Sequence, residues 1–256
     1  MLSSMAELFP DLKRPLIVAH RGGSTGIPNT LDAFRHLIAS GGEAVEFDVR
    51  RTVDGVLVVH HGPNAAGLRL ARLTYDEFCR YTHQHQPTLD EAIELCGSRL
   101  HLNVEIKARG YEQAVLECLN ARVARSHYMI SSYSATVLAK CRSLDPGITT
   151  GLIVVASARP VIFPVARAQK CKADVLVLNH RIAQPLLTRR AAQHGLQVLL
   201  WTVNTPRGVS HAFGDPNVAG IITDYPHRAE RIRRLVRQIA ISGRGGQETG
   251  TSHVLN

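Results

Sequence analysis

Ionisable side chains stand at the ends of four apolar runs in the first half of the chain. Each run contains or immediately precedes a pair of them: His20 and Arg21, Glu46 and Asp48, His60 and His61, Glu105 and Lys107. Three carboxylates could hold a divalent cation through oxygen ligands, and imidazoles could transfer protons near neutral pH. The arginine and the lysine could bind an anion such as phosphate. The pattern therefore indicates a metal-assisted reaction on an anionic substrate.

The apolar runs that must position these groups are rich in valine, isoleucine and leucine, which is typical of buried strands. Side chains two residues apart on a strand share a face. Glu46 and Asp48 should therefore point the same way, and so should Glu105 and Lys107. His60 and His61 should point to opposite faces, so that only one of them can serve a common site. We expect His61 to be that residue.

Strands and helices alternate along the rest of the chain. Further apolar runs end at Ser131, near Val155, at Leu178, at Trp201 and at Thr223, and each is followed by a stretch with helical periodicity. The count is eight strands and eight helices, with residues 56–59 as an extra strand, and this favours a (β/α)₈ barrel. A doubly wound open sheet is the alternative, but its polar residues should gather near one switch point rather than at five or more strand ends.

The chain length of 256 residues suits one barrel domain. We expect an N-terminal lead-in over residues 1–15, one catalytic domain over residues 16–240 and a disordered tail over residues 241–256, which is rich in glycine. Helices are expected at residues 30–39, 111–124, 134–143, 160–170, 182–194, 206–213 and 226–239, and one more begins at Thr88 with a capping-box pattern.

The formal charge of +9 and the pI near 9.7 favour anionic partners: phosphate esters, nucleic acid or an acidic membrane surface. Aromatic residues make up only 5% of the chain and no nucleic-acid-binding motif is visible, so no nucleic-acid partner is expected. Peripheral contact with an anionic membrane is left open. The late arginine series between Arg228 and Arg244 is interpreted as a solvated helix face.

The five cysteines are well separated, odd in number and without a C-x-x-C pair. They are interpreted as ordinary unpaired thiols, which suits a reducing compartment. No signal peptide and no membrane-spanning run is recognised, so a cytoplasmic location is expected. The oligomeric state is left open.

Several candidate site residues have a second interpretation. Glu46 and Asp48 could face solvent at a strand end, but two buried ionised groups are costly unless they are paired or bind a metal. Three converging carboxylates suit Mg²⁺ or Ca²⁺ better than Zn²⁺. Lys107 could be a simple ion-pair partner or could hold a phosphoryl oxygen. Trp201, the only tryptophan, could pack in the core or form a wall for the alcohol part of a substrate. The remaining histidines are expected on the surface.

With these residues in view, the chain resembles the glycerophosphodiester phosphodiesterase family. The resemblance extends from about residue 17 to residue 226, and its short motifs occur in the family's order. They are His20-Arg21-Gly22, Pro28-Asn29-Thr30, Glu46-Phe47-Asp48-Val49, Thr52-Val53-Asp54-Gly55, His61, Glu105-Ile106-Lys107, Trp201-Thr202-Val203-Asn204 and Thr223-Asp224-Tyr225-Pro226.

The resemblance implies a (β/α)₈ barrel of the phospholipase-C-like phosphodiesterase type. It implies that one Mg²⁺ or Ca²⁺ ion is bound by three ligands, Glu46, Asp48 and Glu105. It assigns the catalytic pair to His20 and His61, and phosphate binding to Arg21 and Lys107. The implied substrate is a small glycerophosphodiester. Its own hydroxyl would attack phosphorus, a cyclic phosphate would form as the alcohol leaves, and water would open the ring.

The sequence departs from the family pattern at two positions. Pro28 replaces a glutamate, and Gly62 replaces the aspartate after the second histidine. These departures keep two alternatives open. One is a lipid-directed phosphodiesterase resembling a phospholipase D on the same barrel, and the other is a degenerate barrel that binds phosphodiesters without cleaving them.

Overall fold

A closed barrel of parallel strands forms the centre of the molecule. The computed structural model describes residues 8–24, 26–156 and 163–245. Within these ranges, β1 pairs with both β11 and β2, and this double pairing closes the sheet. The predicted (β/α)₈ barrel is therefore confirmed and the open sheet is excluded. The barrel strands are β1 (Leu16–His20), β2 (Ala44–Arg51), β6 (His101–Ile106), β7 (Tyr128–Ser132), β8 (Thr150–Val154), β9 (Val175–Asn179), β10 (Gln197–Trp201) and β11 (Gly220–Thr223).

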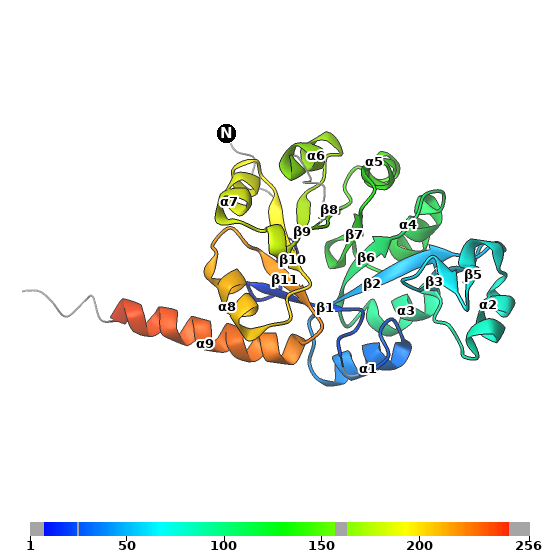
Figure 1. Ribbon diagram of the computed structural model, residues 1–256, viewed down its shortest axis with the longest axis horizontal. Helices are drawn as coiled ribbons and strands as arrows, with labels where there is room; N and C mark the ends of the chain where they lie inside the picture. Colours follow the sequence, from blue (N-terminus) through cyan, green and yellow to red (C-terminus); the bar gives the residue numbers. More distant parts are fainter. Residues whose placement is uncertain (1–7, 25, 157–162, 246–256) are drawn as a thin grey trace, which may run out of the picture.

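Helices connect successive strands and surround the barrel (Figure 1). Several begin where a Thr or Ser side chain accepts a backbone N–H of the first turn, and Thr88 forms the predicted capping box with Glu91. The helix expected at residues 160–170 begins at Pro164, and residues 160–162 lie outside the described residues. The ring consists of α1 (Leu31–Ala39), α3 (Leu89–Cys96), α4 (Glu112–Asn120), α5 (Ala135–Leu144), α6 (Pro164–Lys170), α7 (Pro185–Gln193), α8 (Pro206–Gly214) and α9 (Pro226–Gly245), with short 3₁₀ turns η2 (Arg125–His127) and η3 (His180–Ile182).

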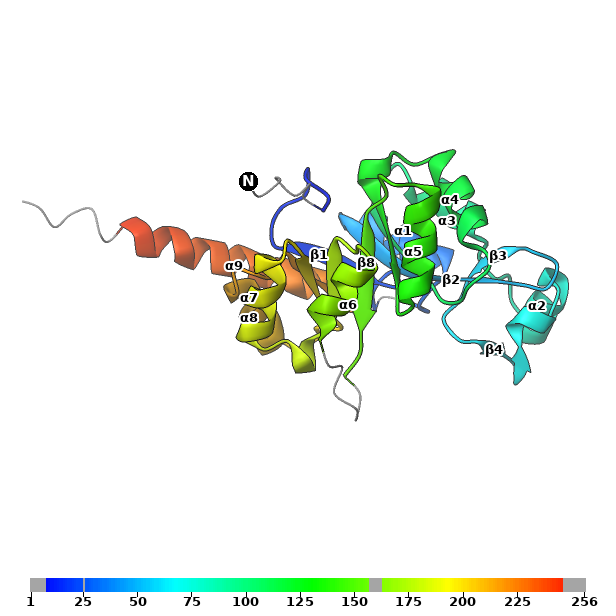
Figure 2. The same cartoon turned by 90° about the horizontal axis from the view of Figure 1, so that it is seen from above.

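A small subdomain interrupts the barrel pattern after β2. Its strand β3 (Leu57–Val59) pairs antiparallel with β2, as expected for the extra strand. It continues through a hairpin of β4 (Asn64–Ala65) and β5 (Leu68–Arg69), the turn η1 (Leu70–Arg72) and the helix α2 (Tyr75–Thr82). Figures 1 and 2 show that it projects on the side of the molecule opposite to α9. The hairpin and α2 were not predicted, although Thr74 and Glu77 form a capping box that marks the helix start.

The N-terminal lead-in packs against the barrel from residue 8 onward. Leu8 and Phe9 are almost fully buried in a cluster with interior strand residues such as Leu16 and Val175. The Phe9 ring lies 4.7 Å from the ring of His101, at the beginning of β6. This segment therefore covers the end of the barrel at which the strands begin, which we call the barrel floor.

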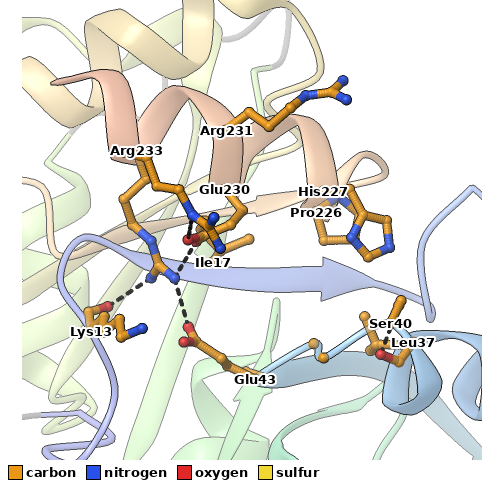
Figure 3. Close-up of a pocket in the computed structure, with 14 residues that line it drawn as sticks. Lys13, Ile17, Leu37, Ser40, Glu43, Pro226, His227, Glu230, Arg231 and Arg233 are labelled. Carbon is orange, nitrogen blue, oxygen red and sulfur yellow. Dashed lines mark hydrogen bonds and ion pairs between the residues drawn. The ribbon is translucent and has the colours of Figure 1, made fainter. Parts of the chain in front are cut away.

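Helix α9 is fixed to the barrel floor through Arg233, whose side chain is only 3% exposed. Its guanidinium donates a hydrogen bond to the carbonyl of Lys13 and pairs with the carboxylates of Glu43 and Glu230 (Figure 3). It also donates to the carbonyl of Pro15. For this residue, the prediction of a solvated arginine face is wrong, because the arginine satisfies carbonyls that precede β1. The helix continues to Gly245, past the expected domain end at residue 240, and the tail over residues 246–256 lies outside the described ranges.

The five cysteines are free thiols, as predicted. None of the described helices is both long and apolar enough to span a membrane.

Candidate active site

Three buried carboxylates meet at the end of the barrel where the strands terminate. Glu46 and Asp48 share the inward face of β2, and Asp48 stands beside Glu105 in the register between β2 and β6. Ligand oxygens of all three residues lie within 4.8 Å of one another. The strand alternation read from the sequence thus brings the predicted ligands together, in a group small enough to surround one cation.

The carboxylates differ in how readily they ionise. Burial, reinforced by the charges of Asp48 and Glu105, raises the pKa of Glu46 well above its ordinary value. Burial also raises the pKa of Glu105 to about 7, although Lys107 opposes the shift. Burial alone would raise the pKa of Asp48 too, but its contacts with His61, Lys107, Arg21 and Asn29 outweigh it and hold that pKa far below normal. Glu46 and Glu105 are therefore harder to ionise than Asp48, and a bound cation would favour their ionised forms.

Asp48 is surrounded by donors. Its Oδ2 accepts a hydrogen bond from Asn29 Nδ2 at 2.8 Å and lies 3.1 Å from Arg21 Nε. Its Oδ1 lies 3.1 Å from Lys107 Nζ, which also lies 2.6 Å from Glu105 Oε1. Arg21 and Lys107, the predicted phosphate-binding residues, thus stand on either side of the cluster. In this arrangement a phosphate near the carboxylates would meet two positive charges.

His20, the last residue of β1, is held by Asp224 immediately after β11. Its Nδ1 lies 2.6 Å from Asp224 Oδ1, and its Nε2 faces Glu46 at 3.9 Å. The hydrogen bond from His20 lowers the pKa of Asp224, so this carboxylate is ionised and can only accept. Nδ1 therefore carries a hydrogen, and Nε2 is directed toward the carboxylate cluster. Asn204 Nδ2 donates to the other oxygen of Asp224 at 2.5 Å and fixes its orientation.

The two adjacent histidines after β3 lie in different surroundings. His61 Nδ1 is 3.2 Å from Asp48 Oδ2 and 2.8 Å from Arg21 Nη2, and half of its side chain is exposed. His60 instead packs edge-on against Phe78 of α2, with ring centroids 5.1 Å apart. His61 is thus the residue that reaches the carboxylate cluster.

The turn after His20 places both the histidine and the arginine. Arg21 has a φ of 54° and Gly22 a φ of 92°, a left-handed conformation that glycine adopts without strain. A Cβ on Gly22 would lie 2.8 Å from the Cβ of Ala33 in α1. The turn also directs the Arg21 backbone N–H to the carbonyl of Glu46 at 2.7 Å. The glycine of the His-Arg-Gly motif is therefore required by close approach of α1.

Trp201 ends β10 and faces Tyr133, with ring centroids 5.9 Å apart. The two rings border a small hollow that also contains His20, Glu46 and Glu105. Polar atoms of Asn103, Ser131 and Trp201 Nε1 are buried there without a hydrogen-bond partner among the described residues. Such groups are costly unless a ligand or water satisfies them, so the hollow is prepared for a polar molecule.

The sequence reasoning assigned no role to five residues that the structure places at the site: Asn29, Asn103, Tyr133, Asn204 and Asp224. Three of them, Asn29, Asn204 and Asp224, stood inside the quoted motifs, which was the available signal. The two departures from the family pattern lie beside the cluster: Pro28 is exposed next to the buried Asn29, and Gly62 follows His61.

Comparison with known proteins identifies relatives of the whole barrel. The profile of the glycerophosphoryl diester phosphodiesterase family matches residues 20–228. A glycerophosphodiester phosphodiesterase of Caldanaerobacter subterraneus subsp. tengcongensis is 27% identical, over 88% of this chain and 99% of its own length. One from Bacillus altitudinis is 29% identical, over 86% of this chain and 99% of its length. A rat lysophospholipase D is 24% identical, over 82% of this chain and 83% of its own.

A solved structure shows the same architecture. The glycerophosphodiester phosphodiesterase of Thermotoga maritima superposes with a TM-score of 0.70 at 26% identity, over 87% of this chain and 97% of its own. The sequence comparison and the structural comparison therefore agree on the glycerophosphodiester phosphodiesterases. The segment that the family profile matches contains every residue of the carboxylate cluster, together with His20 and His61.

Proposed function

This chain belongs to the glycerophosphoryl diester phosphodiesterase family, and on that premise we propose how its barrel hydrolyses glycerophosphodiesters to a glycerol phosphate and a free alcohol. The chain is a phosphoric diester hydrolase. The mechanism depends on one observation. His20 is oriented by Asp224 and directs Nε2 toward the three buried carboxylates.

We propose that Glu46, Asp48 and Glu105 hold one divalent cation, Mg²⁺ or Ca²⁺. The donor set consists of oxygen atoms, which these hard cations prefer. Burial raises the pKa values of Glu46 and Glu105, and a bound cation would favour the ionised form of both carboxylates. When bound, the cation supplies Lewis-acid stabilisation of negative charge on the substrate oxygens.

Arg21 and Lys107 would bind the phosphate oxygens. Arg21 contacts one oxygen of Asp48 and Lys107 contacts the other, so a phosphoryl group next to that carboxylate would come within their range. Lys107 is also held over the Tyr133 ring at 5.3 Å, which limits its conformations. Charge-assisted hydrogen bonds from the Arg21 and Lys107 side chains would orient the phosphorus for in-line attack.

His20 and His61 would transfer the protons. The hydroxyl of the substrate adjacent to the phosphodiester attacks phosphorus, one imidazole removes its proton and the other protonates the departing alcohol. A cyclic phosphate remains, and water opens it with the two imidazoles in exchanged roles. His20 is suited to the base role, because Asp224 accepts from Nδ1–H and stabilises the imidazolium that forms.

A lysophospholipid is a second candidate substrate, favoured by apolar side chains around the barrel mouth. These residues follow the C-terminal ends of strands and have exposed fractions from 37% to 75%: Ile27, Tyr133, Val155, Phe163 and Leu186. They could receive an acyl chain while the phosphodiester occupies the carboxylate site, and the basic charge would favour an anionic membrane. The relative named lysophospholipase D supports this candidate.

The proposed partners are therefore small phosphodiesters or a lipid surface, and no nucleic acid. We also propose a cytoplasmic location, which the five unpaired thiols support.

A substrate panel tests the proposal. The purified protein is assayed with glycerophosphocholine, glycerophosphoethanolamine, glycerophosphoinositol and lysophosphatidylcholine, each with Mg²⁺, Ca²⁺ or chelator. We expect metal-dependent release of alcohol, and preference for the lysolipid would favour the second candidate. An analogue whose hydroxyl beside the phosphodiester is removed should bind without being cleaved. Binding of every substrate without turnover would instead support the non-catalytic barrel.

A further inference from the structure

A second cluster of metal-ligating side chains lies on the barrel floor, at the opposite end from the catalytic carboxylates. Asp11, His101 and His127 each offer a ligand atom, and these atoms lie within 4.8 Å of one another. His101 begins β6 and Glu105 stands four residues later, so the same strand carries both clusters, about 13 Å apart along its length. The floor cluster is therefore separate from the proposed active site.

The contacts within this cluster are specific. His101 Nε2 lies 2.9 Å from Asp11 Oδ1. The rings of His101 and His127 are stacked with centroids 4.5 Å apart and planes inclined by 18°. His101 is buried, so the expectation that the remaining histidines lie on the surface is wrong for this residue, because Phe9 covers its ring.

The segment that carries Asp11 is fixed on both sides. Phe9 is buried in the barrel floor, and the Leu12 N–H donates to the Phe9 carbonyl at 3.1 Å. Two residues after Asp11, the carbonyl of Lys13 accepts from Arg233 of α9 (Figure 3). Asp11 is thus presented to the two imidazoles by ordered backbone, although its own side chain is exposed.

We propose that Asp11, His101 and His127 form a site for a divalent transition-metal ion of the zinc class, which ties the N-terminal segment to the barrel. Two imidazole nitrogens and one carboxylate oxygen match the ligands that Zn²⁺ prefers, whereas the catalytic group offers only oxygens. Selectivity between the two ends of the barrel follows from this difference in donor chemistry.

Binding requires one modest adjustment. Parallel stacked rings do not direct both lone pairs at one point, so one imidazole must turn. His127 can do so, because it is partly buried at the end of η2 and, among the described residues, its ring is held by stacking on His101 and by one contact with the Ser126 hydroxyl, 3.2 Å from Nδ1. Water would complete the coordination on the exposed side next to Asp11.

The test measures zinc on the full-length protein without a histidine tag. Protein stripped with chelator is returned to excess Mg²⁺, which occupies the carboxylate site, and is titrated with Zn²⁺ by calorimetry. Wild type and His36→Ala, which alters an exposed histidine of α1, should bind one more zinc ion per chain than His127→Gln. Asp11→Asn should weaken binding to this site by about tenfold or more, because it removes the charged ligand.

Two further measurements identify the metal ligands and test whether metal binding stabilises the protein. Co²⁺ at the site should give visible absorption typical of nitrogen and oxygen ligands in wild type, and His127→Gln should lack it. Zn²⁺ should raise the Tm of wild type more than that of His127→Gln, whose folding is checked by circular dichroism. Equal zinc stoichiometry and equal Co²⁺ spectra in wild type and His127→Gln would overturn the proposal and leave Asp11 and His101 as a simple ion pair.

Discussion

The side chains of His20 and Asp224 are joined by a 2.6 Å contact between Nδ1 and Oδ1, although 204 positions separate the two residues in the chain. The contact crosses the seam between β1 and β11, where the barrel closes. It links the first and the last strand of the fold at the catalytic end. Closure of the barrel therefore brings His20 and Asp224 together as the proposed general base and its orienting partner.

Asp224→Asn should lower kcat by about 10²–10⁴-fold, because an amide can donate to Nδ1 and thereby favour the wrong tautomer of His20. Binding of the divalent cation should be unchanged, since Asp224 lies outside the carboxylate group. Steady-state kinetics and metal titration of the variant check both parts. Asp32→Asn, at an exposed position of α1, is the matched control. Normal turnover by Asp224→Asn would show that His20 needs no such orientation.

His20→Ala and His61→Ala should each reduce turnover by about 10²–10⁴-fold while the fold persists. His60→Ala should retain most activity, because its ring packs against Phe78 and faces away from the carboxylates. Parallel assays and circular dichroism of the three variants separate catalysis from folding. An inactive His60→Ala beside an active His61→Ala would reverse the proposed assignment.

Removal of the divalent cation by chelator should abolish activity, and Mg²⁺ or Ca²⁺ should restore it. Glu46→Gln keeps the shape of the side chain but removes a charge, so it should weaken metal binding and require more metal for half-maximal activity. Glu43→Gln, which alters the partner of Arg233 on the barrel floor, should leave the metal requirement unchanged. Full activity in chelator, with no metal found by elemental analysis, would contradict the proposed site.

The stabilisation that the metal gives should increase as pH rises from about 5 to about 7. The pKa of Glu105 is raised from 4.5 to about 7, so between these values the folded chain holds a proton that the unfolded chain has released. The free energy of unfolding of the metal-free protein should therefore fall as pH rises through this window. A bound cation should remove this loss, because it stabilises the ionised form of Glu105. Thermal unfolding with and without Mg²⁺ at several pH values measures the difference in Tm. A difference that shrinks with rising pH would contradict the assignment.

Gly22→Ala should destabilise the protein by about 1–3 kcal/mol and should also impair catalysis. Alanine at a φ of 92° is strained, and its Cβ would meet Ala33 at 2.8 Å. Relief of the clash would displace the turn that positions His20 and Arg21. Urea unfolding gives the stability change, and Gly26→Ala, where no atom lies within 4 Å of the added carbon, is the control. Equal stability of the two variants would count against the packing argument.

Much of the fold could be predicted from the sequence, because its signals are local. Apolar runs with polar ends marked the strands, and capping residues such as Thr88 marked the helices. The insertion of α2 was missed, although Thr74 and Glu77 carried a similar signal, because the barrel pattern offered no place for another helix. Its existence depends on the hydrophobic cluster around Phe78, which links residues from several short elements.

The sequence by itself determined which residues share a face of a strand, since alternation has a period of two and depends on nothing distant. That rule was enough to group Glu46 with Asp48 and to separate His60 from His61. Only the tertiary structure decided that Asp224 orients His20, that Asn29 holds Asp48 and that Arg233 is buried. These relationships depend on strand register and barrel closure, which bring together residues from distant parts of the chain, and no local pattern encodes such distances.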